Sequence, residues 1–334
     1  MFVASSPPFL HHAFAGSLAA DALAMPVHWY YDRSALRTDY GLVDHYLKPK
    51  PIHPGSILHR SHYTAFNEKG DILREQAAYW GQSGVHYHQF LQAGENTLNF
   101  QLARELHTLV SRTAPYDPDV WLEGYIRFML TPGKHRDTYV EEYHRAFFTN
   151  YARGKNPRAC GISDNHIGGL SQVPALAASL PLADEKTLRA AVREHVSLTH
   201  HHPGVLRAAD TLVRLLAALG NGQSLRSALT SEAGDFFREK KSQTYESQSD
   251  ELIIGRIFSP ACYIDEAFPA ALYLAWKYHQ DFSAGIIANA MCGGDSCHRG
   301  AVVGALLGAA CGVPERWTAS LFTPLPSPAA PATS

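Results

Sequence analysis

The chain has 334 residues, 46% of them hydrophobic and 18% charged, which is enough apolar material for one large core. Its 29 basic and 31 acidic residues leave a net charge of -2, so the charge balance gives no reason to expect a nucleic-acid partner. The longest uncharged apolar stretch near the C-terminal end, residues 301–313, is shorter than the roughly 20 residues of a membrane span. We therefore expect no membrane partner.

The first residues, MFVASSPPFLHHAF, lack the basic segment and apolar run of a secretory signal, so we expect a cytoplasmic protein. Five cysteines without a CxxC pair predict free thiols rather than a disulfide framework. Nineteen histidines, with clusters at 11–12 and 200–202, raise the question of a metal site. Adjacent histidines do not by themselves form one, because ligands must converge in space. Nothing in the composition fixes an oligomeric state.

Helical periodicity dominates the chain. Between residues 98 and 110 the apolar side chains recur about every fourth residue, which places them on one face of a helix. Similar patterns occur at 205–219 and 270–279. One short piece, 253–258, has the composition of a strand. We therefore predict an all-α fold.

Two long polar stretches, 31–63 and 151–171, interrupt the helical patterns and are rich in Gly, Pro, Asn, Asp and His. Loops of this length in a compact domain are usually functional. Residues 10–315 are predicted to form one domain, since no linker divides them. The proline- and alanine-rich end, 323–334, is predicted to be a disordered tail.

The most informative segment is AMCGGDSCHRGAVVGALLGAACG, residues 290–312. Gly293 and Gly294 tolerate positive φ and so permit a tight turn before Asp295, which stands where a helix N-cap belongs. Beyond it, glycine recurs at every fourth residue from Gly300 to Gly312. This spacing gives a stripe without side chains, against which a second helix could pack closely.

This segment resembles the last motif of the ADP-ribosylglycohydrolase family, GGD[TS]D[TS] followed by a helix of small residues. Further stretches match the family in order: GSLAADALAMPVH at 16–28, GENT at 94–97, SLTH at 197–200, and the run 265–291 that leads into the final motif. Several ordered matches are far more specific than any one of them.

The resemblance covers roughly residues 14–312 and implies a compact multi-helix bundle with a central cleft. In the family, two Mg²⁺ ions held by carboxylates of the second and last motifs grip the ribose of ADP-ribose and help water attack the anomeric carbon. The implied function is a hydrolase that cleaves an ADP-ribosyl or related glycosidic bond. Its partner would be a small-molecule or ADP-ribosylated substrate.

At the matched positions the sequence departs from the family, and only Glu95 and Asp295 remain as carboxylates. The residues carried over are Glu95, Asp295, Cys297 and His28 as catalytic, Asn96, Thr97, His166, Gly293 and Gly294 as substrate-binding, and Glu95, Asp295, Cys297, His298 and His28 as metal ligands. We expect His28, Glu95, Asp295, Cys297 and His298 to converge. Mg²⁺ requires oxygen ligands, so this mixture suits a single Zn²⁺ or Fe²⁺ better than the family's ion pair.

A second option needs no metal. Cys297, in the first turn of a helix, could be a nucleophile with His28 as its base. Structural interpretations stand beside both options: Asp295 as an N-cap, Glu95 as a partner of a helix dipole, and Cys297 as a buried thiol. At the level of function, the alternatives are a hydrolase of a different small molecule and a non-catalytic sensor or crystallin-like protein.

Overall fold

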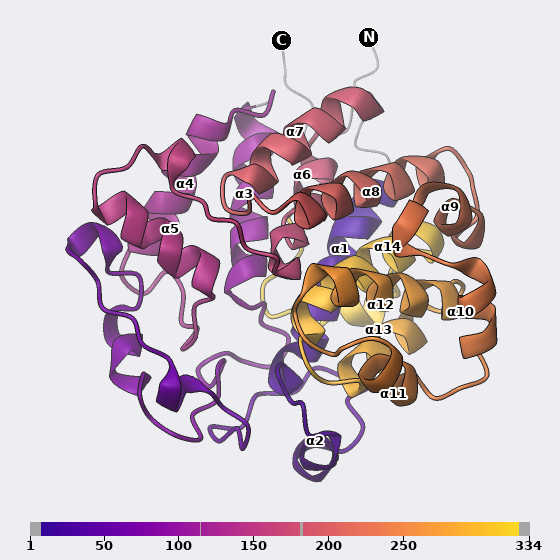
Figure 1. The fold of residues 1–334 in the computed structure, drawn as a ribbon, viewed down its shortest axis with the longest axis horizontal. Coiled ribbons are helices and arrows are strands. Elements are labelled where there is room, and N and C mark those ends of the chain that lie inside the picture. The colour runs from indigo at the N-terminus through magenta and orange to yellow at the C-terminus, as the bar shows by residue number, and fades with distance from the viewer. Residues whose placement is uncertain (1–7, 114, 181–182, 327–334) are drawn as a thin grey trace.

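The computed structural model describes residues 8–113, 115–180 and 183–326, and within these ranges the chain is helical and forms no β-strand (Figure 1). The prediction of an all-α fold is confirmed. The first helices are α1 (Pro8–Ala24), α2 (Arg33–Tyr40), α3 (Leu98–Thr113), α4 (Pro118–Leu130), α5 (Glu142–Ala152), α6 (Val173–Ser179), α7 (Glu185–Ser197) and α8 (Pro203–Gly220). They are followed by α9 (Leu225–Glu232), α10 (Glu239–Tyr245), α11 (Asp250–Leu252), α12 (Ile264–Lys277), α13 (Phe282–Met291), α14 (Ser296–Cys311) and α15 (Glu315–Ala319).

Helices α1 and α14 form the centre of the fold and pack directly against each other. The predicted glycine stripe makes this contact possible. A Cβ atom on Gly304 would lie 2.2 Å from the carbonyl oxygen of Gly16, and one on Gly308 would lie 2.3 Å from that of His12. Real side chains never approach so closely, so the two backbones could not meet at this distance with larger residues. The predicted close helix packing is confirmed.

The other helices surround this pair. In Figure 1, α4 and α5 lie on one side of α1 and α14, α9 lies on the other, and α12 and α13 lie below them in the view. The apolar stripe predicted for residues 98–110 faces inward on α3, where Leu98, Leu102, Leu106 and Val110 are all buried. The inward face of α12 likewise buries its apolar side chains.

The strand expected at 253–258 is wrong. The segment Ile253–Ile257 forms a π-helical turn that ends in an isolated bridge between Ile254 and Phe258. Gly255 reverses the chain there at φ +151°, where a Cβ atom would meet the guanidinium group of Arg33. The β-branched residues of the segment suggested a strand, but the glycine and its tertiary contact decide the local structure.

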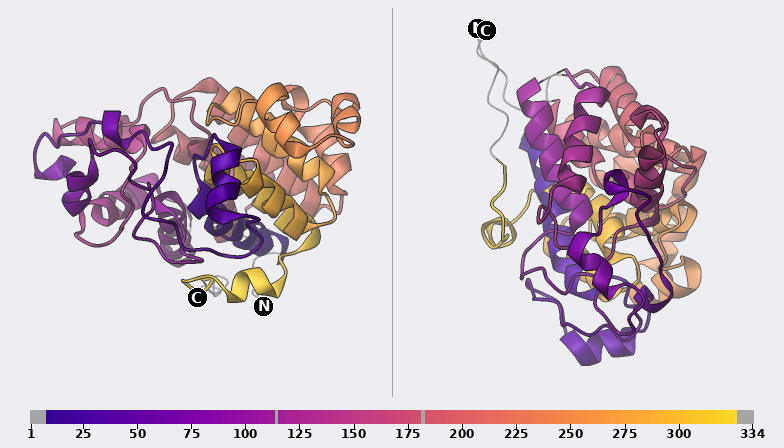
Figure 2. Two further views of the ribbon diagram at one scale, coloured as in Figure 1. Left: turned by 90° about the horizontal axis from the view of Figure 1, so that it is seen from below. Right: turned by 90° about the vertical axis from the view of Figure 1, so that its left-hand side faces the viewer.

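The connection between α2 and α3, residues 41–97, contains short 3₁₀ turns and runs along the side of the molecule that carries α5 (Figure 2). At the other end of the chain, the carbonyl groups of Thr323 and Pro324 accept hydrogen bonds from Arg104, so the predicted tail begins as ordered chain. Its residues 327–334 lie outside the described part of the structure. None of the described helices is long and apolar enough to cross a bilayer.

Candidate functional site

A tight turn before α14 carries the centre of the site. Gly293 and Gly294 have φ values of +65° and +63°, as the sequence predicts. A Cβ atom would lie 2.2 Å from the Tyr30 carbonyl oxygen at the first glycine and 2.1 Å from the Pro260 carbonyl oxygen at the second. The backbone of Gly294 exchanges hydrogen bonds with Trp29 and Tyr30, at 2.7 and 2.8 Å. The turn is therefore fixed to the segment that follows α1.

Asp295 begins α14 as its N-cap and is completely buried. Its Oδ1 atom accepts hydrogen bonds from His28 Nε2 at 3.0 Å and from His298 Nδ1 at 2.7 Å. Burial alone would raise the pKa of Asp295, but His298 and the hydrogen bond from His28 bring it well below its ordinary value. Its Oδ2 atom has no hydrogen-bond partner among the described residues, and the nearest ring nitrogen is His166 Nε2 at 3.6 Å. Asp295 is thus a carboxylate with one free oxygen.

Behind His28, a chain of hydrogen bonds leads to a second carboxylate. His28 Nδ1 lies 2.8 Å from His88 Nε2, and His88 Nδ1 lies 2.6 Å from Asp137 Oδ1. Together with the bond to Asp295, the two rings make three hydrogen bonds through four nitrogens, which requires three protons and one positive charge on the pair. Burial lowers the pKa of His28 well below its ordinary value, which favours a neutral His28 ring.

On the other side of Asp295, His298 faces a third carboxylate. Burial opposes a charge on His298, but the charge of Asp295 outweighs it and raises its pKa to about 9. Glu141 Oε1 lies 3.5 Å from His298 Nε2 and accepts a hydrogen bond from Asn99 at 2.9 Å. Burial raises the pKa of Glu141 to about 6, and its Oε2 atom has no partner within the described chain.

His166 reaches the site from the loop before the 3₁₀ turn Ile167–Leu170. Its Nδ1 atom accepts a hydrogen bond from Gly168 N at 2.8 Å. Burial lowers the pKa of His166 to about 4, so the ring is neutral and its proton must sit on Nε2, which faces Asp295. Atoms of His166, Cys262 and Asp295 lie within 4.8 Å of one another, and so do those of His28, Asp295 and His298. Both groups are candidate metal sites by distance.

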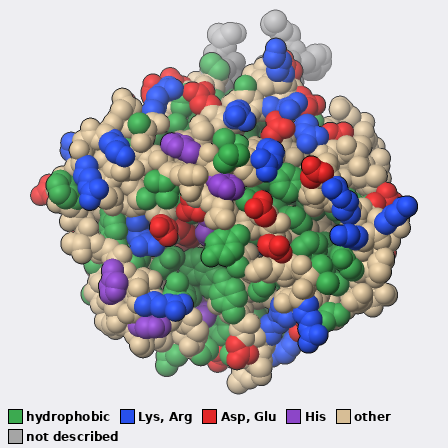
Figure 3. All heavy atoms as spheres, viewed as in Figure 1, with side chains coloured by type: hydrophobic (Ala, Val, Ile, Leu, Met, Phe, Trp, Pro, Cys, Tyr) green, Lys and Arg blue, Asp and Glu red, His purple; other side chains and the backbone are tan. Residues whose placement is uncertain are grey.

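A cavity of about 560 Å³ opens onto this cluster, and we call it the aromatic cavity. It is lined by Trp29, Tyr31, Gly55, Ile57, Arg60, Tyr87, Tyr139, Glu141, Glu142, Asp164, Asn165, His166, Cys262 and Tyr263. In Figure 3, hydrophobic side chains gather below the centre of the face shown, with acidic side chains beside them. Both long polar stretches predicted to be functional contribute to the lining, through Arg60 and His166 among others.

Glu95 does not join the cluster. Its carboxylate is held by Arg136 at 2.7 Å and by the backbone nitrogen of Gln92, and it borders a different, smaller cavity. The expected convergence is corrected on this point, because a guanidinium group of the chain pairs with the one acid of GENT. Asn96 and Thr97 also turn away from the aromatic cavity, since both donate hydrogen bonds to the buried carboxylate of Asp21.

Cys297 is buried in the centre of the fold, and its sulfur contacts the carbonyl oxygen of Asp21 at 3.7 Å. Burial and the charges of Asp21 and Asp295 raise the pKa of the thiol well above its ordinary value. Both nitrogens of His28 are engaged by other residues. The structure therefore does not bring Cys297 and His28 together as a nucleophile and its base.

Several residues at this centre were not predicted from the sequence. Glu141 precedes α5 beside Glu142, and such an acidic pair is normally attributed to the helix dipole. His88 and Asp137 are far apart in sequence, and nothing in their spacing indicates a contact. Cys262 is a single cysteine with no ligand-like spacing. Only the folded chain brings these residues to Asp295.

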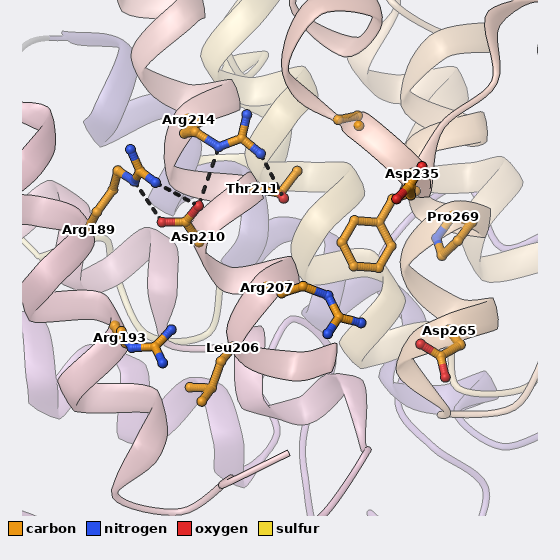
Figure 4. A pocket seen from close by; sticks show the side chains of 13 residues that line it. Arg189, Arg193, Leu206, Arg207, Asp210, Thr211, Arg214, Asp235, Asp265 and Pro269 are labelled. Carbon is orange, nitrogen blue, oxygen red and sulfur yellow. Dashed lines mark hydrogen bonds and ion pairs between the residues drawn. The ribbon is translucent and has the colours of Figure 1, made fainter. Parts of the chain in front are cut away.

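A second cavity, of about 660 Å³, lies between α7, α8 and α12 (Figure 4). Four arginines line it, but Asp210 holds two of them, with Arg189 Nε at 2.6 Å and Arg214 Nε at 3.4 Å. Asp235 and Asp265 also border this cavity. The aromatic cavity instead is lined by His166, which faces the unpaired oxygen of Asp295 at 3.6 Å, and by Glu141, so that cavity is the candidate functional site.

Fold and site together define a helical protein with a polar centre at the start of its innermost helix. The chain belongs to the ADP-ribosylglycohydrolase family, whose model matches residues 10–327. A solved structure described as an ADP-ribosylglycohydrolase-related protein complex is similar in fold, with 20% sequence identity and a TM-score of 0.58. The similarity covers 94% of this chain and 92% of that one. A comparison with curated proteins finds no match.

Proposed function

We propose that the protein is a hydrolase that cleaves a glycosidic bond at the aromatic cavity, without the paired Mg²⁺ ions of its family. The observation that carries this proposal is Asp295, a buried carboxylate whose Oδ2 atom is unpaired in the described structure and adjoins the cavity residue His166. A buried oxygen without a partner costs roughly 1–3 kcal/mol, a cost that a purely structural N-cap would not need to bear. Family membership supports hydrolysis as the reaction class.

The chain's own groups suit an oxocarbenium-like transition state. Asp295 stays ionised because its pKa is low, so it stabilises positive charge at the anomeric carbon rather than taking up a proton. Its free Oδ2 atom accepts a hydrogen bond from the attacking water, which needs little further activation in such a transition state. Glu141 lines the cavity, and its pKa of about 6 suits the protonation of a leaving group near neutral pH.

His28 and His298 hold Asp295 in place by hydrogen bonds, and His298 also faces Glu141. The positive charge on His298 faces two carboxylates, Asp295 and Glu141, so this part of the cluster keeps a negative balance until Glu141 takes up a proton. A negative balance favours a cationic transition state without help from a metal ion. His28 contributes by orienting Asp295 through a neutral ring.

The donor set fits two Mg²⁺ ions poorly. Glu95 is paired with Arg136, and Asp21 is occupied by Asn96 and Thr97. Among the described residues of the cluster, the carboxylate oxygens without a partner are Asp295 Oδ2 and Glu141 Oε2, which are too few for two Mg²⁺ ions. By distance a single ion fits better, at His28, Asp295 and His298, and this nitrogen-rich set suits Zn²⁺ or Fe²⁺. To hold it, His298 would have to lose its proton, and both rings would have to give up hydrogen bonds that they make in this structure. When bound, such an ion would lower the pKa of a coordinated water.

The test is release of free sugar from a panel of N- and O-ribosides by the wild-type protein and the Asp295→Asn variant. Asparagine keeps the shape of the N-cap but removes the charge. We expect turnover by the wild type and a loss of at least about a thousandfold in kcat for the variant, the scale of one central electrostatic group. Turnover that is unchanged in the variant, or absent from the whole panel, would overturn the proposal.

A further inference from the structure

The charges that line the aromatic cavity indicate what kind of substrate enters it. Glu141, Glu142 and Asp164 contribute carboxylates to the lining, and Arg60 is the one arginine among the lining residues. A hydrogen bond from the backbone nitrogen of His166 to Asp164 Oδ1, at 2.9 Å, holds the Asp164 carboxylate at the cavity. A diphosphate would enter this cavity against a negative balance, whereas a cation would be attracted.

The walls of the cavity are aromatic. The ring of Trp29 meets those of Tyr87 and Tyr139 edge to face, with centroids 4.7 and 4.9 Å apart. Tyr31 and Tyr263 stand at the opening, each about half exposed. Aromatic faces attract cations, and the combination of aromatic rings with carboxylates is the usual protein environment for a cation of low charge density.

The backbone supports a functional role for Trp29. It has φ +63°, one of two positive φ values among the described residues other than glycine. This conformation costs of order 1–3 kcal/mol for a bulky residue and is retained where the surrounding structure enforces it. Here the hydrogen bond from Trp29 N to Gly294 O enforces it, and the indole stacks on His28 with centroids 4.0 Å apart. The strained backbone therefore places the indole against His28, which donates a hydrogen bond to Asp295.

We propose that the cavity accepts N-glycosides whose aglycone is a planar, delocalised cation of the pyridinium type, and that it discriminates against substrates that carry a diphosphate. This inference rests on the proposed glycosidic-bond hydrolysis and specifies its substrate class. The aglycone lies among the aromatic rings near Glu142 and Asp164, and the sugar lies toward Asp295.

The chemistry of such a substrate agrees with the site. The bond between the anomeric carbon and the ring nitrogen breaks, and its electron pair returns to the nitrogen, so the aglycone departs as a neutral pyridine. The oxygen of water bonds to the anomeric carbon and its proton passes to solvent, which leaves the free sugar. The leaving group needs no proton, so Glu141 is dispensable as an acid for this class of substrate.

A measurement of ligand binding tests this inference separately from the proposed hydrolysis. Isothermal titration would compare N-ribosylnicotinamide, which carries the pyridinium charge, with its reduced dihydropyridine form, which is neutral and nearly the same size, and with ADP-ribose. We expect the cationic riboside to bind at least about tenfold more tightly than the neutral form, the scale of a partly desolvated cation–π contact. Equal binding of the two forms, or tighter binding of ADP-ribose, would overturn the inference.

Two variants test whether acidic residues of the aromatic cavity cause the preference for the cationic riboside. In a Glu142→Gln, Asp164→Asn double variant the preference for the cationic form should fall to about twofold or less. Glu123→Gln removes an exposed acid on α4, away from the cavity lining, and should keep the preference. Preference retained in the double variant would contradict the inference. Binding of the cation without sugar release would overturn the proposed hydrolysis alone, because the binding preference would still hold.

Discussion

The carboxylates at two helix starts, Asp295 at α14 and Glu95 before α3, both match motifs of the family but have different partners in this protein. In the family resemblance, the start of α14 and the segment before α3 both supply carboxylates to one centre. In this protein Asp295 has an unpaired oxygen in the described structure and faces the cavity residue His166, whereas Glu95 is paired with Arg136 and borders another cavity. The two matched carboxylates therefore have different surroundings. Variants of the two regions should therefore have very different effects.

The largest effect is expected at Asp295. Besides the loss of activity described above, Asp295→Ala should destabilise the fold by about 3–5 kcal/mol, because it leaves the positively charged ring of His298 buried without its partner. Chemical denaturation followed by circular dichroism measures this change. A variant as stable as the wild type would show that the pair is not ionised.

The next effect concerns the turn that aims Asp295. Gly293→Ala should destabilise by more than about 3 kcal/mol, because it adds both left-handed strain and a contact with the carbonyl oxygen of Tyr30. Gly312→Ala is the matched control at the other end of α14. It has φ +75° and ψ 169°, which is also strained for alanine, but open space around its Cβ position, so it should cost only about 1–3 kcal/mol. Equal costs in thermal unfolding would contradict the close approach at Gly293.

Glu141→Gln should lower kcat by about a hundredfold for ribosides with a neutral, poorly departing leaving group, the usual contribution of a general acid. For a pyridinium riboside the loss should be below about tenfold. The wild-type rate on the first class should fall as the pH rises through about 6, since the raised pKa of Glu141 keeps the acid form below that pH. A pH profile that is the same in the variant would exclude Glu141 as the acid.

Asp137→Asn tests the chain behind His28. The amide lacks the negative charge of the carboxylate that contacts His88, so the hydrogen bonds that orient His28 toward Asp295 should weaken. We expect kcat to fall by about ten- to a hundredfold with KM nearly unchanged, as for other groups that orient a site residue. The imidazole proton resonances of His28 and His88 should shift in the same variant. Unshifted resonances with reduced activity would contradict a positioning role.

The smallest effect is expected at Glu95. The side chain of its partner Arg136 is 43% exposed, so solvent screens the pair. Glu95→Gln should change the stability by less than about 1 kcal/mol and the activity by less than about twofold. A large loss of activity, measured beside Asp295→Asn with the same substrate, would return Glu95 to the site.

Local patterns in the sequence were enough to predict the centre of the fold. The four-residue glycine spacing of α14 and the apolar stripe of α3 follow from helix geometry, and the paired glycines before Asp295 follow from the need for positive φ. These features depend on neighbours in the chain, so the sequence contains the information needed to predict them.

The composition of the site depends on contacts between distant segments. Whether Glu95 faces the cavity depends on Arg136, and whether His28 acts as a base depends on His88 and Asp137. No periodicity links these positions. Position-by-position comparison with the family could therefore identify Asp295, but it could not detect that Glu141 lies near the same centre.

The most direct test of the account measures sugar release from a riboside after all divalent ions have been removed by a chelator, and again after Mg²⁺ is restored. We expect Mg²⁺ to change the rate of sugar release by less than about twofold, whether the stripped protein is already active or needs a single Zn²⁺ or Fe²⁺ ion. A protein that is inactive when stripped and fully restored by Mg²⁺ would contradict it, and would show that the family's paired site is retained.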